Sequence, residues 1–255
     1  MELQLVQDYV TSLFLHVVRV GAFLAVLPLF GQQRDSAILR IVLSTALGAV
    51  FWWIGEQRLQ TPPGLFALGI MAVREGVVGL ALGFALATMT SLLVSAGEFI
   101  STEMGFSLAR VINPETGVNA TVVSQLMQIL GFLLILQLNL HHEALRVLEQ
   151  TFHACRVGQP FEFEPIWAGI LALVSGSVEL ALQYSFPVLG TMLLVSVGTV
   201  LLGRAVPAIN LMEFVFALRV LLALGGMALF LGRSAPFLIE QFGAILARTA
   251  AMFPV

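Results

Sequence analysis

Long apolar stretches separated by short polar segments occupy almost the whole chain. A helix needs about 20 apolar residues to cross the hydrocarbon core of a bilayer, and most of the stretches have about that length. Two of them, 65–97 and 166–203, are too long for one crossing and contain no polar loop that would divide them. The pattern predicts helices at 10–30, 37–54, 65–97, 122–140, 166–203 and 211–232, with a shorter amphipathic helix at 235–252.

The two overlong stretches are interrupted in different ways. Arg74 and Glu75 lie about one third of the way into the first, and Glu179 and Pro187 interrupt the second. Because proline lacks a backbone N–H, Pro187 is predicted to bend or break the helix there. Lipid tolerates irregular backbone only where protein or a cavity shields it. We therefore expect an all-α membrane protein with long, bent or broken helices and helical hairpins, packed in a hetero-oligomeric assembly.

The composition agrees with a membrane protein. Hydrophobic residues make up 58% of the 255 residues and charged residues only 11%, against about 25% charged in an average soluble domain. This argues against a water-soluble enzyme, and a net charge of −3 argues against nucleic-acid binding. Cys155 is the only cysteine, so no intramolecular disulfide can form. The N-terminal residues lack the basic region of a signal peptide, and we expect the first apolar segment to stay in the mature protein.

Ionisable residues inside the apolar stretches would each cost several kcal/mol if they faced lipid, about 2.5–3.5 kcal/mol for Arg or Asp. One interpretation is pairing within the chain, Arg74 with a neighbouring Glu or Glu213 with Arg219; another is that they line a polar path. So many charges are hard to hide in a monomer of this size, which favours a hetero-oligomer. The residues are His16, Arg19, Arg40, Arg74, Glu75, Glu179, Glu213 and Arg219.

Two pairs of small residues have the four-residue spacing that lets membrane helices pack closely. They are Gly79 with Gly83, and Ala172 with Gly176. Because Gly and Ala are plentiful in this chain, the spacing predicts helix contacts rather than a particular function.

The least generic part of the chain runs from Gly97 to Gly117. Glu98 and Glu103 follow a long uncharged run, so they lie where a helix leaves the apolar zone. Asn113 and Pro114 end the helical geometry, because the residue before a proline avoids the α region. A tight turn follows before the next apolar helix begins.

This segment resembles the FliR family of flagellar export-gate proteins, whose injectisome counterparts are the SctT proteins. The family pattern GE-x-I-x-x-x-MG-x-S-x-A, followed by (N/D)P-x-TG and SQ, is matched by Gly97, Glu98, Ile100, Met104, Gly105, Ser107, Ala109, Asn113, Pro114, Thr116, Gly117, Ser124 and Gln125. Weaker matches follow the family order at Arg19, Pro28, Phe30, Gly31, Arg40, Asn139, His141, His142, Arg204, Pro207 and Asn210. Leu140 stands where the family usually has Gly.

The resemblance implies a single FliR-like membrane domain over 1–255, in the bacterial inner membrane at the flagellar basal body. FliP-like and FliQ-like subunits would assemble with it into the channel, and FlhB-like and FlhA-like components would pack nearby. Unfolded export substrates would pass through. In this family the loop after the MG-x-S-x-A stretch projects into the channel as a plug, here at about 106–121.

A plug closes a channel with apolar side chains that exclude water and ions. The residues implied for it are Met104, Phe106, Leu108, Val111, Ile112, Asn113, Pro114 and Gly117. The charged residues expected to be buried or to contact partner subunits are Arg19, Arg40, Arg74, Glu75, Glu98, Glu103, Glu213 and Arg219.

Other classes of function have weaker support. The chain contains no G-x-x-x-x-G-K-[ST], H-E-x-x-H or G-x-S-x-G motif, and we expect no catalytic residue, cofactor or metal. His141 and His142 with Glu143 and Glu149 could in principle bind a metal, but adjacent histidines point to different faces of a helix. A stand-alone secondary transporter would use the intramembrane charges and the break at Pro187, yet no internal repeat is visible. An injectisome SctT-type protein is the alternative within the family.

Overall fold

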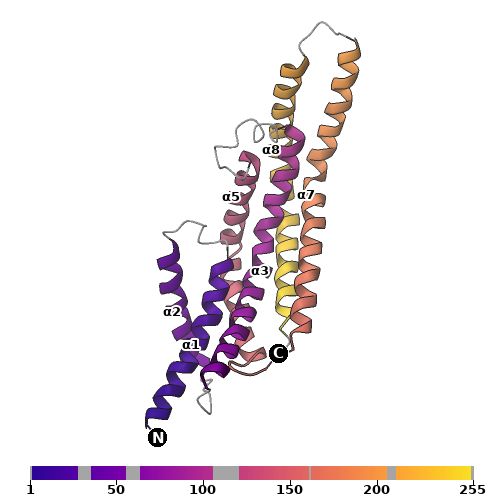
Figure 1. The fold of residues 1–255 in the computed structure, drawn as a ribbon. Helices are drawn as coiled ribbons and strands as arrows, with labels where there is room; N and C mark the ends of the chain where they lie inside the picture. Colours follow the sequence, from indigo (N-terminus) through magenta and orange to yellow (C-terminus); the bar gives the residue numbers. More distant parts are fainter. Residues whose placement is uncertain are drawn as a thin grey trace. The chain divides into compact units, whose positions relative to one another are not determined.

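The computed structural model describes residues 2–27, 36–55, 64–105, 121–160, 162–205 and 211–253, and the regular elements within them are all helices (Figure 1). Within these residues, five helices are long and apolar enough to cross a membrane, and one bent helix pair, counted as a single span, would make up to six. The predicted fold class, an all-α membrane protein, is confirmed. The helices are α1 (Glu2–Val26), α2 (Ser36–Gly55), α3 (Leu65–Met104), α5 (Val122–Gln137), α6 (Leu140–Ala154), α7 (Glu164–Ala205) and α8 (Leu211–Ala251).

Helices α3, α7 and α8 are much longer than a bilayer is thick. They have 40, 42 and 41 residues. At 1.5 Å per residue each is about 60 Å long, twice the roughly 30 Å of hydrocarbon, and the usual tilt of membrane helices does not absorb that difference. The exposed Glu179 lies near the middle of α7, where it accepts a hydrogen bond from Gln183 Nε2 at 3.1 Å. A large part of each helix must therefore be surrounded by water or by protein.

Neither of the prolines inside α7 and α8 breaks its helix. This corrects the expected division of α8 and the expected break at Pro187, while a bend at Pro187 stays a prediction. Helix α7 is continuous through Pro187. Helix α8 is continuous through Pro236, where separate helices at 211–232 and 235–252 were expected. Each proline removes one backbone hydrogen bond and strains the preceding turn. In an apolar setting a full break would leave several more backbone groups without partners, so the helix continues.

A sharp bend separates α5 from α6, where the sequence predicted one helix that ends at about residue 140. The two helix axes differ by 71°. Asn139 at the bend has φ 54°, a left-handed conformation that asparagine tolerates better than most residues. The hydropathy pattern did not predict α6, because only one face of this helix is apolar. That face carries the buried residues Ala144, Val147, Leu148, Thr151 and Phe152.

The contacts within the chain divide it into two compact units. The first comprises Met1–Met89, Ile135–Val174 and Gly243–Val255, and the second comprises Thr90–Leu134 and Ser175–Phe242. The core of the first unit includes the fully buried Leu15, Val20, Val78, Leu82 and Leu148. The core of the second includes the buried Leu92, Leu93, Ile100, Met127 and Tyr184. The single domain over 1–255 stays a prediction.

In the first unit, α1 and α3 cross at a pair of glycines. A Cβ atom added to Gly83 would lie 2.6 Å from the carbonyl oxygen of Phe23, and one added to Gly79 would overlap the carbonyl oxygen of Arg19. Only glycine allows two helix backbones to approach this closely. The close packing predicted from the Gly79 and Gly83 spacing is thus present, while that of Ala172 with Gly176 stays a prediction.

Alanine at Gly79 or Gly83 should destabilise the first unit by about 1–3 kcal/mol, because the added methyl group forces the two backbones apart. Gly76, on the same helix, is the matched control, since a Cβ there would meet no atom within 4 Å. Gly76→Ala should be neutral or slightly stabilising, as alanine is the better helix former. The midpoint of thermal unfolding in detergent measures the difference. Equal midpoints for the three variants would contradict the close crossing.

Candidate functional site

Arg19 and Glu75 form an ion pair in the interior of the first unit. Arg19 Nε donates a hydrogen bond to Glu75 Oε2 at 2.6 Å, and Nη2 lies 2.6 Å from the same oxygen. The two side chains are only 1% and 3% exposed. The glycine crossing explains how they meet. Glu75 precedes Gly79 by one helical turn, so it lies on the face of α3 that packs against Arg19 of α1.

The remaining donors of Arg19 are also satisfied. Nη1 donates to the carbonyl oxygen of Thr151, and Nη2 donates to that of Cys155, both at 2.7 Å. The guanidinium carbon lies 4.5 Å from the centre of the Phe152 ring. Glu75 Oε1 in turn accepts a hydrogen bond from the backbone N–H of Gly158 at 3.0 Å. The pair thus joins α1 and α3 to the end of α6 and to the turn that follows it.

The sequence could not have identified most of these contacts. Pairing of Arg74 with a neighbouring Glu was expected, but adjacent residues on a helix are about 100° apart. Glu75 faces Arg19, and Arg74 is exposed. The partners on α6 are backbone carbonyl groups at a helix end, and every residue type has one, so no sequence pattern marks them.

Cys155 belongs to the same cluster through its backbone. Its side chain is a free thiol and is buried. Burial raises the pKa of the Cys155 thiol, and the nearby Arg19 guanidinium acts in the opposite direction. A thiol with a raised pKa carries little thiolate at neutral pH and reacts slowly with alkylating reagents. Cys155 is therefore a sensitive local reporter of how tightly this cluster is closed.

A second polar cluster lies in the second unit, where α3 ends and α5 begins. Glu98 Oε1 accepts hydrogen bonds from Ser124 Oγ at 2.7 Å and from the backbone N–H of Thr121 at 3.2 Å. The hydroxyl groups of Ser101 and Thr121 are 2.6 Å apart. A Cβ on Gly97 would lie 2.6 Å from the Cα of Ser124, so the two helices touch there.

This second cluster explains part of the central sequence motif. Gly97 and Glu98 are adjacent on α3, and Ser124 of α5 meets them from 26 residues further along the chain. Gly97 permits the close approach of α3 and α5, and Glu98 ties the first turn of α5 to α3. Thr121 and Ser101 complete the cluster and were not identified from the sequence. We call Glu98, Ser101, Thr121 and Ser124 the hairpin clamp.

Most residues of the implied plug lie outside the described residues. Met104, at the end of α3, is buried at 1% exposure. Gly105 follows with φ 85°, a conformation that favours glycine and ends the helix. The implied plug residues outside the described part are Phe106, Leu108, Val111, Ile112, Asn113, Pro114 and Gly117.

The other charged residues singled out from the sequence are in varied surroundings. Glu103 is exposed near the end of α3, and Arg40 is half-buried on α2. Arg219 is half-buried on α8 and donates a hydrogen bond to Ser196 Oγ at 3.0 Å. The side chain of Glu213 lies outside the described part, so its expected pairing with Arg219 is untested. Contacts of these residues with partner subunits stay predictions.

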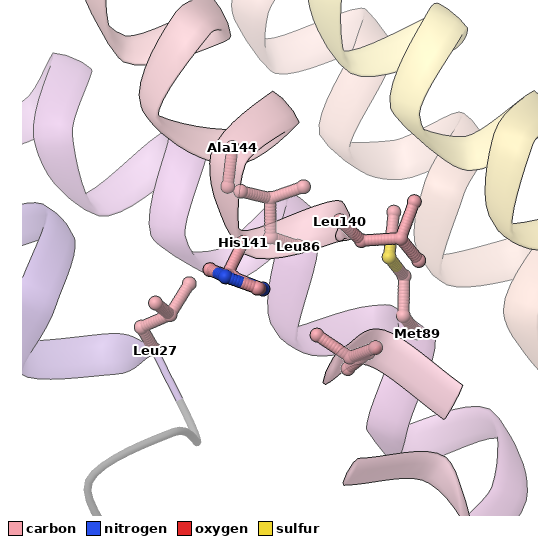
Figure 2. Close-up of a pocket in the computed structure, with 7 residues that line it drawn as sticks. Leu27, Leu86, Met89, Leu140, His141 and Ala144 are labelled. Atoms are coloured by element: carbon pink, nitrogen blue, oxygen red, sulfur yellow. The ribbon is translucent and has the colours of Figure 1, made fainter. Parts of the chain in front are cut away.

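A small apolar pocket lies at the bend between α5 and α6 (Figure 2). The His141 ring projects into it near Leu27 and Leu86, and its Nδ1 is buried with no hydrogen-bond partner among the described residues. The ring centres of His141 and His142 are 4.1 Å apart. Within the described part of the chain, no three His, Cys, Asp or Glu side chains form a group that could hold a metal ion.

Residues 10–248 match the model of a protein family described as bacterial export proteins, family 1. The chain belongs to this family. Its relatives include several proteins named flagellar biosynthetic protein FliR, which agrees with the resemblance of the central motif to the FliR family. The relative from Bacillus subtilis (strain 168) is 29% identical over 240 residues, which cover 92% of this chain and 90% of the relative.

Two further relatives extend the similarity to other bacteria. Flagellar biosynthetic protein FliR of Caulobacter vibrioides is 26% identical over 94% of this chain and 95% of the relative. The protein of the same name from Escherichia coli (strain K12) is 27% identical over 91% of this chain and 88% of the relative. The similarity thus covers nearly the full length of this chain and of each of these relatives.

Replacing Arg19 with Met should destabilise this export-family protein by about 3–5 kcal/mol, because it leaves the buried Glu75 without its counter-charge. Arg74→Met is the matched control, one residue from Glu75 but exposed, and should change stability by less than about 0.5 kcal/mol. Thermal unfolding in detergent measures both. Maleimide labelling of Cys155 gives a local readout and should be faster in the Arg19→Met protein only. Equal labelling rates in both variants would show that Arg19 does not close this cluster.

Proposed function

We propose that this protein is a core component of the export gate of the flagellar type III secretion apparatus, located in the bacterial inner membrane at the flagellar basal body. It forms the channel for unfolded flagellar export substrates together with FliP-like and FliQ-like membrane subunits. Membership of the export family and full-length similarity to FliR proteins support this role. The names of these relatives favour the flagellar system over the injectisome alternative.

The observation that carries the proposal is the hairpin clamp. Glu98 and Ser124 fasten α3 to α5 on either side of the segment 106–120. Thr121, the residue that follows this segment, is itself bound through its backbone N–H. A plug must be held at a defined point while its apolar residues meet the channel, and a fixed base of this kind provides that. We assign the plug role to this segment on the sequence motif together with its base.

The long helices support an assembly with other membrane subunits. Helices α3, α7 and α8 exceed the hydrocarbon thickness by about 30 Å each. Large apolar side chains stay exposed along them, among them Leu80, Phe186, Leu194 and Leu229. Apolar surface outside lipid needs protein to cover it. FliP-like and FliQ-like subunits cover it in our proposal, with FlhB-like and FlhA-like components nearby. The role requires no cofactor and no catalytic residue.

Native mass spectrometry of the tagged protein, co-expressed with the two small membrane proteins encoded beside it, tests the assembly. We expect one stable complex that contains several copies of each. In a flagellate strain that lacks its own gene for this protein, the full chain should restore export of flagellar substrates and motility. A well-behaved monomer or homodimer that takes up a small solute alone would instead identify a stand-alone transporter.

Deleting 113–119 should leave the complex assembled but make the membrane leaky to small ions, because the segment that blocks the channel is shortened. The complex with Glu98→Ala should conduct small ions to a smaller extent, because the substitution removes the hydrogen bonds that hold the base of the segment. Glu103→Ala is the matched control, an exposed glutamate on the same helix, and should not leak. Conductance of the purified complexes in planar bilayers measures all three. Unchanged conductance in the deletion variant would remove the plug assignment.

A further inference from the structure

Arg219 of α8 and Ser196 of α7 form a polar contact between these two helices in the second unit. The only acceptor that Arg219 reaches among the described residues is the hydroxyl oxygen of Ser196, at 3.0 Å from Nη2. Its Nε is buried and lacks a hydrogen-bond partner within that part of the chain. A hydroxyl group is neutral, so this contact leaves the positive charge of the guanidinium uncompensated.

Arg19 in the same protein shows which groups a fully buried guanidinium has around it and Arg219 lacks. Arg19 has a carboxylate, two backbone carbonyl groups and an aromatic face around its guanidinium. Arg219 has one hydroxyl group. A half-buried guanidinium that is then covered by further protein needs a counter-charge and further acceptors around it. Among the described residues, Arg219 thus has no carboxylate to balance its charge.

Glu213 precedes Arg219 by six residues on α8, whereas side chains that meet on one helix are usually three or four residues apart.

The surface around Arg219 is apolar and open. Leu193 and Val200, one turn either side of Ser196 on α7, are 65% and 59% exposed. Phe216 and Leu222, one turn either side of Arg219 on α8, are 47% and 39% exposed. A cation at the centre of an exposed apolar surface is complementary to an apolar helix that carries one negative charge.

We propose that Arg219 and Ser196 form the docking point for a carboxylate on a membrane helix of a neighbouring subunit, an Asp or Glu flanked by apolar residues. This inference rests on the proposed function, since it names the chemistry of one partner contact in that assembly. A carboxylate would accept from Nη1 and Nη2 of Arg219 together, the bidentate geometry that arginine favours. Leu193, Val200, Phe216 and Leu222 would pack around the pair and exclude water.

A lipid phosphate is the competing anion and fits the position less well. Ser196 lies about 13 Å from the end of α7 at Ala205, at 1.5 Å per residue. Val197, Val200 and Leu201 in that interval are all more than half exposed. If a headgroup were level with Arg219, these apolar turns would lie in the headgroup layer or in water. A protein helix covers the charge and these turns at the same time.

The complex of this chain with its two co-expressed membrane subunits is the material for the test. Arg219→Glu should lower recovery of the intact complex at least about tenfold, because two carboxylates would then face each other. Arg219→Lys should retain part of it, since the charge is kept and the bidentate geometry lost. Arg248→Glu is the matched control, an exposed arginine in the last turn of the same helix, and should assemble normally. Replacing single Asp or Glu residues of the partner helices by Arg should restore assembly of the Arg219→Glu protein at one position.

A photo-crosslinking amino acid at Leu222 identifies the neighbour directly. A crosslink to the partner helix that carries the restoring substitution supports the proposal. Crosslinks to phospholipid only, or restoration by Glu213→Arg in the same chain, would overturn it. Normal assembly of the Arg219→Glu protein would overturn it as well, while leaving the proposed function intact. Failure of the unmodified chain to form any complex would refute the proposed function itself.

Discussion

The buried pair of Arg19 and Glu75 is the interaction on which the first unit depends. Two opposite charges away from water hold their positions only if each finds its partner, so their geometry is strict. Here that requirement fixes three things together: the crossing of α1 over α3, the end of α6, and the turn that leads into α7. Apolar contacts are not directional and would let one helix shift along another, whereas the hydrogen bonds of this pair allow only one register of α1 against α3.

The two polar clusters have the same design in different units. In each, a glutamate on α3 binds groups at the end of another helix, and a glycine near it lets the backbones come close. Gly79 stands one turn after Glu75, and Gly97 immediately precedes Glu98. A carboxylate is well suited to this task because it accepts several hydrogen bonds and so satisfies the backbone N–H groups that a chain reversal leaves open. Helix α3 thereby organises both units.

The sequence predicted the class of fold and the central motif well, and the reasons are physical. Hydropathy reports the long apolar helices directly, and glycine at four-residue spacing reports the close crossing at Gly79 and Gly83. The prediction from the sequence failed where tertiary structure overrides the local preference of a residue. Pro187 predicted a bend or a break, and the break is absent because an apolar environment does not permit it. The amphipathic α6 has no apolar run that a hydropathy pattern could find. The partners of Arg19 on α6 are carbonyl groups, which carry no side-chain signature.

The exposed carboxylate of Glu179 has a consequence for how this protein enters a membrane. It divides α7 into apolar runs at 165–178 and 180–203. Since an exposed charge avoids the bilayer centre, hydrocarbon takes one run or the other. At 1.5 Å per residue the first run is about 21 Å long and the second about 36 Å, so only the second is long enough for the roughly 30 Å of hydrocarbon. The bilayer then covers 180–203 and leaves 165–178 outside, where neighbouring protein has to cover exposed apolar side chains such as Trp167 and Leu171.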